Sequence, residues 1–192
     1  LGVPRVFEIL AGVLGIAAFA ITVYAGLAGN QTATANLAPT MVFVLFWVGI
    51  PVLSACVGDV FAAVSPWRAT GRAVGWVAQR VAGGGGLPAP MTYPERLGRW
   101  PAAAGIFLFA WVELAYVNRD HPQTLAILAL VYAAVMLVGM SLYGVEAWVR
   151  NADAFGVAFG LIALLAPLRW GEGRVRLQWP LAGAIRMPQI AG

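Results

Sequence analysis

Long apolar stretches separated by short polar links dominate the sequence. Residues 6–28, 41–64, 101–117 and 124–145 are apolar, with Glu8, Asp59 and Glu113 as their only charges. At about 1.5 Å of rise per helical residue, segments of this length approach or exceed the ~30 Å hydrocarbon core of a bilayer. The pattern predicts an all-α fold, a polytopic transmembrane helical bundle of about four spans.

The stretch at 41–64 contains two signs of irregularity. Pro51 lies near its middle and removes one backbone donor, which predicts a bend there. At the end of the stretch, Ser65 suits a helix N-cap and Pro66 the first position of a new helix. We therefore expect one helix to end and another to begin at this point.

Four further segments complete the predicted organisation. Residues 66–82 are amphipathic and predict an interfacial helix along the membrane surface, and residues 83–92 form a linker rich in glycine and proline. Residues 154–168 are apolar but short, which favours a re-entrant or interfacial helix, with a tilted fifth span as the alternative. Residues 169–192 are expected to form a polar, unstructured tail within this single membrane domain.

Composition agrees with a membrane protein and disfavours a soluble one. Hydrophobic residues make up 61% and charged residues 10%, whereas about 25% of residues are charged in soluble domains. The net charge of +4 comes from arginines beside the apolar stretches, so the expected partner is the lipid bilayer and not nucleic acid. Arginines concentrate in 68–99 and 150–186, with Arg119 on the opposite side. This predicts a cell-membrane protein with both ends of the chain cytoplasmic.

Acidic residues inside apolar stretches are the first candidates for chemistry, because a carboxylate in hydrocarbon is costly unless it is paired or neutral. Glu113 lies well inside 101–117, with Tyr116 one helical turn away. One hypothesis makes them a proton-carrying or substrate-orienting pair. The other makes Glu113 a protonated structural acid that is hydrogen-bonded to Tyr116 or to a neighbouring helix.

A second group of charges is expected to gather near the cytoplasmic edge. Asp59, Glu8 and Glu146 should lie at similar depth, where Arg68 or Arg5 can pair with any of them. We interpret this set as a buried charge network that fixes helix register, with a catalytic role as the alternative. The only histidine, His121, stands beside an acid in a polar turn, so no metal or cofactor site is evident.

Three segments carry a resemblance to a known family: GDVFAAVSPWR at 58–68, YPERLGRWPAAAGIFLFAWVELAY at 93–116, and YGVEAWVRNADAFGVAFGL at 143–161. They resemble actinobacterial integral membrane proteins labelled fenitrothion hydrolase. The resemblance implies hydrolysis of an organophosphate triester, with release of a nitrophenol. It also implies that this chain is an internal fragment of a longer protein.

Three readings of function stay open. A hydrolase component would bind an apolar phosphotriester near Glu113 and Tyr116, although the chain shows no catalytic constellation of its own. A proton-coupled transporter would use Pro51 as a hinge and Glu113 or Asp59 as the titrating group. A structural subunit would use its acids only for packing, against other membrane subunits or further parts of its own chain.

Overall fold

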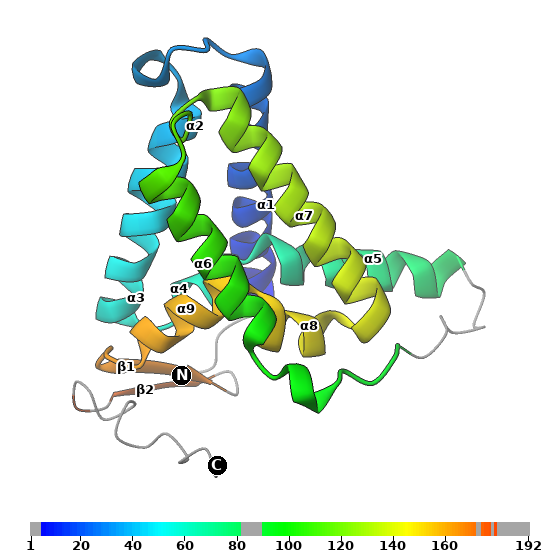
Figure 1. Ribbon diagram of the computed structural model, residues 1–192. Coiled ribbons are helices and arrows are strands. Elements are labelled where there is room, and N and C mark those ends of the chain that lie inside the picture. Colours follow the sequence, from blue (N-terminus) through cyan, green and yellow to red (C-terminus); the bar gives the residue numbers. More distant parts are fainter. Residues whose placement is uncertain (1–4, 82–89, 172–173, 178, 180–192) are drawn as a thin grey trace.

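The computed structural model describes residues 5–81, 90–171, 174–177 and 179. The described chain is an all-α bundle with one short β-hairpin, as Figure 1 shows. The longer helical segments are α1 (Arg5–Ala28), the π-helical η2 (Thr40–Gly49) with α3 (Ile50–Val57), α6 (Trp100–Ala115) and α7 (Pro122–Tyr143). Two short elements, η1 (Ala33–Ala35) and α2 (Leu37–Pro39), lie between α1 and η2. The remaining elements are α4 (Val60–Val64), α5 (Pro66–Val81), η3 (Glu95–Leu97), α8 (Val145–Ala152), α9 (Ala154–Ala163), β1 (Leu168–Gly171) and β2 (Arg174–Leu177).

Three helical segments of the described chain are long and apolar enough to cross a membrane. They are Val6–Ala28, Leu37–Val57 and Pro122–Tyr143, with mean hydropathies of 2.3, 2.2 and 2.5. Many of their large apolar side chains point outward, among them Leu14, Val48 and Val131. Exposed apolar surface of this extent suits a lipid environment, and the helices are compatible with a membrane-embedded protein.

The expected span at 101–117 forms helix α6, but this helix is short. It has 16 residues and ends at Ala115, which gives a length of about 24 Å. It packs against the short helices α8 and α9. The predicted helix is therefore present, two residues shorter at its C-terminal end than the apolar stretch suggests.

The prediction of one helix over 41–64 is wrong, because the chain breaks at Gly58. The helical run ends at Val57, Gly58 adopts a φ of 101°, and Asp59 caps the new helix α4. That φ is open to glycine and disfavoured for other residues. The irregularity expected near Pro51 takes the form of π-helical η2, which ends at Gly49, two residues before the proline.

The short elements α5, α8, α9 and the hairpin lie in the lower half of the molecule in Figure 1, where α8 packs against both α5 and α9. Helix α5 confirms the predicted helix at 66–82, ending at Val81. The expected helix at 154–168 is shorter than predicted, since α9 stops at Ala163. Helix α8 was not predicted as a separate element.

The predicted polar tail at 169–192 is wrong for its first part. Strands β1 and β2 pair antiparallel, with Leu168 opposite Leu177 and Gly171 opposite Arg174. Alternation of polar and apolar residues in LRWG and RVRL is typical of such strands. The rest of the tail, apart from Trp179, and the linker residues 82–89 lie outside the described residues.

An aromatic cluster fills the centre of this end of the bundle. Phe159 of α9 is 1% exposed, and its ring contacts Phe46, Phe61 and Phe155 at centroid distances of 5.3, 5.5 and 5.9 Å. Edge-to-face aromatic pairs contribute about 0.5–1.5 kcal/mol each beyond burial. Because these rings come from η2, α4 and α9, they hold the short helices against the long ones.

Candidate functional site

Asp153 is a completely buried carboxyl group at the junction of helices α8 and α9. It is 0% exposed and caps α9 by accepting a hydrogen bond at Oδ1 from the Gly156 backbone N–H, at 3.1 Å. The Tyr132 hydroxyl donates to the same oxygen at 2.8 Å. The Ala154 N–H in turn donates to the Tyr132 oxygen at 3.0 Å. The carboxyl and the phenol therefore form one hydrogen-bonded unit.

The second oxygen of this carboxyl group is different. Oδ2 of Asp153 is buried and has no hydrogen-bond partner in the described part of the chain. It lies against Gly156, where an added Cβ would be only 2.8 Å from it. A buried polar atom left without a partner is costly, and a functional role is one recognised reason for its retention.

The position of Tyr132 sets the depth of the pair. Tyr132 lies ten residues into the 22-residue helix α7, which has no charged residue. At about 1.5 Å per residue, the phenol is ~15 Å from the helix start. Helix α7 is long and apolar enough to span a bilayer, and the middle of a spanning helix lies in the membrane interior. In the sequence, Asp153 lies eight residues after the apolar stretch at 124–145, and it was not among the predicted site residues.

Asp59 occupies a similar place at the other helix break. Its Oδ1 accepts a hydrogen bond from the Ala62 N–H at 3.0 Å, and its Oδ2 lies near Gly160 of α9, 3.6 Å from the position that a Cβ there would take. Asp59 is outside the candidate span that ends at Val57. Burial raises the pKa of its carboxyl group, against the opposing effects of the Ala62 N–H and the Arg68 charge.

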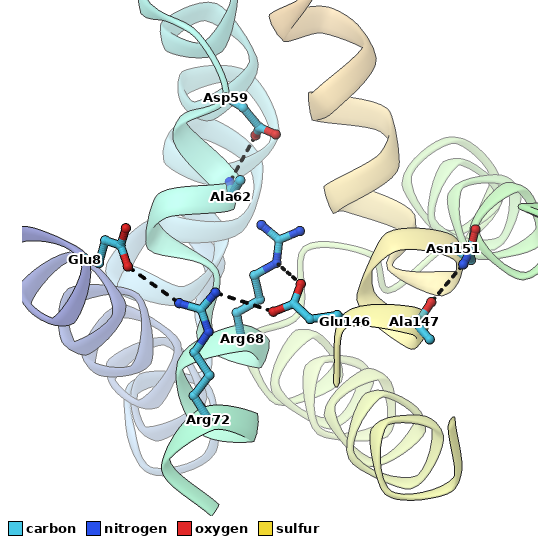
Figure 2. A network of polar contacts seen from close by, with 8 residues as sticks. All are labelled: Glu8, Asp59, Ala62, Arg68, Arg72, Glu146, Ala147 and Asn151. Atoms are coloured by element: carbon cyan, nitrogen blue, oxygen red, sulfur yellow. Dashed lines mark hydrogen bonds and ion pairs between the residues drawn. The ribbon is translucent and has the colours of Figure 1, made fainter. Parts of the chain in front are cut away.

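The predicted charge network exists, although its membership and burial differ from expectation. Figure 2 shows Arg72, which was not predicted as a member, between Glu8 at 3.8 Å and Glu146 at 3.4 Å. Arg68 contacts Glu146 at 3.8 Å. Asp59 makes no ion pair in Figure 2 and bonds only to Ala62.

The prediction that this network is buried is wrong. The side chains of Glu8, Arg72 and Glu146 are 54%, 60% and 65% exposed, and only Arg68, at 30%, is largely covered. Exposed ion pairs of this kind contribute about 0–1 kcal/mol. The network joins α1, α5 and α8 at the end of the bundle, and Arg68 is its one member that reaches inward.

Glu113 and Tyr116 lie apart from Asp153. Glu113 is in the last turn of α6, nearer to its end than the sequence suggests, and its backbone carbonyl accepts a hydrogen bond from Arg119 Nη1 at 2.8 Å. Tyr116 is the C-cap residue with extended backbone, and its ring lies 6.3 Å from that of Trp111. Ala154 meets α6 at Gly105, eight residues or about 12 Å before Glu113.

The structure thus separates two sets of candidate residues. In the described ranges, no group of three or more His, Cys, Asp or Glu side chains is placed to hold a metal ion. Comparisons with protein-family models, with curated proteins and with solved structures find no match to this chain.

Proposed function

We propose that this chain is the proton-binding part of a proton-coupled transporter in the cell membrane, with Asp153 as the proton-binding group. The observation that carries the proposal is a carboxyl group at 0% exposure whose Oδ2 has no partner among the described residues. An ionisable side chain at the depth of a membrane interior is a functional candidate by default.

The surroundings of Asp153 accommodate both protonation states. Burial in an apolar site favours the neutral acid, for which Oδ2 is free to hold the proton. The ionised form is stabilised by the donors Tyr132 O–H and Gly156 N–H at Oδ1. A group that is stable in both forms is suited to taking up and releasing a proton.

The breaks between helices are the points at which this part of the protein would bend during transport. Asp153 lies where α8 ends and α9 begins, and Asp59 lies where α3 gives way to α4. Interrupted helices that meet at buried charged groups are a recurring feature of secondary transporters. In the proposed orientation the end bearing Arg68, Arg72 and Glu146 faces the cytoplasm, in accordance with its arginine content.

Proton uptake by proteoliposomes tests this function. The purified protein is reconstituted into vesicles that contain a pH-sensitive dye, and a potassium diffusion potential, negative inside, drives protons inward. We expect acidification faster than in protein-free vesicles. Asp153→Asn keeps the helix cap through its amide oxygen but cannot carry a proton, so uptake should fall to the protein-free rate.

Asp120→Asn is the matched control for this experiment. It makes the same chemical change in the exposed turn between α6 and α7, and uptake should equal that of the wild-type protein. Acidification no faster than in protein-free vesicles, or equal rates for wild type and Asp153→Asn, would contradict the proposal.

The resemblance noted in the sequence favours a second candidate function, hydrolysis of an organophosphate triester near Glu113 and Tyr116. Its test is nitrophenolate release from a nitrophenyl phosphotriester by membranes that contain the protein. Turnover that is lost in Glu113→Gln at matched abundance would support hydrolysis. Release no greater than that of empty-vector membranes would eliminate it.

A further inference from the structure

Two carboxyl oxygens face the same side of helix α9. A Cβ at Gly156 would lie 2.8 Å from Asp153 Oδ2, and a Cβ at Gly160 would lie 3.6 Å from Asp59 Oδ2. Residues four apart lie on one helical face, and their Cα atoms differ by about 6 Å along the axis. The oxygens not engaged in capping therefore lie about one turn of α9 apart, along a face that carries no side chain at either position.

This face has room for a small bridging group. At Gly160, an added methyl group would have Asp59 Oδ2 as its only neighbour within 4 Å among the described residues outside its own helix and its chain neighbours. A methyl group and a water molecule are similar in size, and a water in a buried polar site needs two or more polar partners. Two carboxyl groups one turn apart provide such partners.

The positive charge of Arg68 acts on the carboxyl groups of both Asp59 and Asp153. Its guanidinium extends between Asp59 and Glu146 in Figure 2. Its Nε is buried without a hydrogen bond and lies 3.8 Å from Glu146. The positive charge of Arg68 stabilises the state in which one of these carboxyl groups has lost its proton.

The two acids also differ in access. Asp153 is fully buried, whereas Asp59 is half-buried. Among the side chains that the structure describes, the other charged or titratable groups that act on the pair are Arg68 on α5 and Tyr132 on α7. Of the two acids, Asp59 is thus the more accessible to a proton from the aqueous side.

We propose that Asp59 relays protons to Asp153 along the Gly156–Gly160 face of α9, an inference that rests on the proposed function. In the transfer, the O–H bond at Asp59 Oδ2 breaks as that oxygen protonates a bridging water. The water gives another of its protons to Asp153 Oδ2, where a new O–H bond forms. Asp59 is left as a carboxylate beside Arg68, and a proton from the aqueous side restores it.

A pH jump followed by infrared spectroscopy tests the relay. The protein is held in lipid nanodiscs, and the carboxyl C=O band of Asp153 is identified as the one lost in Asp153→Asn. In Asp59→Asn the band should reach its full equilibrium intensity but rise roughly tenfold or more slowly, the scale expected when an acid–base group is removed. Asp59→Glu keeps a transferable proton and should restore most of the rate.

The outcomes separate the two proposals. A full-intensity band that rises as fast in Asp59→Asn as in wild type overturns the relay and leaves the proton-binding role of Asp153 in place. A rise as slow in Asp59→Glu as in Asp59→Asn, with Asp59→Glu folded as stably as wild type, also overturns it, since a carboxyl group would then not be the requirement. A protein with no titrating band assignable to Asp153 overturns both proposals.

Discussion

Single glycines decide how closely the helices of this protein approach. At Gly15 on α1, an added Cβ would overlap the backbone carbonyl oxygen of Val64, whereas at Gly75 on α5 it would meet nothing within 4 Å. Gly15 lies four residues after Ala11 on one face of α1, a spacing of small residues that lets another helix approach closely, and Val64 of α4 lies against it. Positions with the same residue type therefore differ in what they tolerate.

Gly15→Ala should destabilise the protein by about 1–3 kcal/mol, since the backbone of Val64 must move. The matched control Gly75→Ala should be neutral or stabilise by up to about 1 kcal/mol, because alanine favours the helix. Melting temperatures of the purified variants in the same detergent measure both. Equal melting temperatures for Gly15→Ala and wild type would contradict the packing at this position.

The Asp59 carboxyl group makes stability depend on pH. Its pKa in the folded protein is raised above the ordinary 3.8 by burial, so the folded state retains the proton to higher pH than the unfolded chain. The stability that the neutral form contributes is then lost as pH rises through the folded pKa. Asn at this position mimics the neutral acid and still accepts from the Ala62 N–H.

The melting temperature of Asp59→Asn should therefore increase relative to that of wild type as pH rises. The two proteins should melt alike near pH 3.8, and at neutral pH the variant should melt a few degrees higher, the scale of roughly 1 kcal/mol. The control Asp120→Asn should have the same melting temperature as wild type at every pH. A difference between Asp59→Asn and wild type that is constant with pH would contradict the raised pKa.

At the scale of elements, the apolar pattern predicts most helices but not where they are interrupted. Stretches 6–28 and 124–145 correspond to α1 and α7 within two or three residues, because a continuous apolar run has no competing structure in lipid. The break at Gly58 depends on one positive φ angle, and a glycine inside an apolar run gives no warning of it. The apolar pattern likewise predicts one helix at 154–168 and gives no sign of α8 as a separate helix before it.

Helix α5 is expected to lie at the membrane boundary. Its exposed side includes Val74, Trp76 and Val77, and the Arg80 guanidinium lies 4.6 Å from the Trp76 ring centre, an arrangement suited to headgroup depth. Helix α7 exposes Val131 near its middle, which should face the acyl chains.

Spin labels can compare these two depths. In a Cys56→Ser background, which removes the only cysteine, labels are attached at Val77→Cys and Val131→Cys in separate variants. Collisions with dissolved oxygen should dominate at position 131, and position 77 should show comparable collisions with oxygen and with a polar nickel reagent. A label at 77 as deep as that at 131 would contradict the interfacial placement of α5.

For the whole molecule, the arrangement of the chain determines which residues come together. Asp153 and Tyr132 are 21 residues apart in the sequence, and Asp59 and Gly160 are 101 apart. The membrane class and all-α fold follow from composition and pattern. The candidate site does not, because in the sequence Asp153 is one more polar residue after a span. Glu113, the more prominent acid, lies about 12 Å along α6 from Gly105, where that helix meets Ala154.

Equilibrium infrared titration of the protein in lipid tests directly whether Asp153 binds a proton, with wild type, Asp153→Asn and Tyr132→Phe compared. We expect a carboxyl C=O band that appears as pH falls and is absent from Asp153→Asn. In Tyr132→Phe the band should persist to higher pH, because the carboxylate loses a hydrogen-bond donor. Identical spectra for wild type and Asp153→Asn at every pH would show that Asp153 does not bind a proton, and would contradict the account.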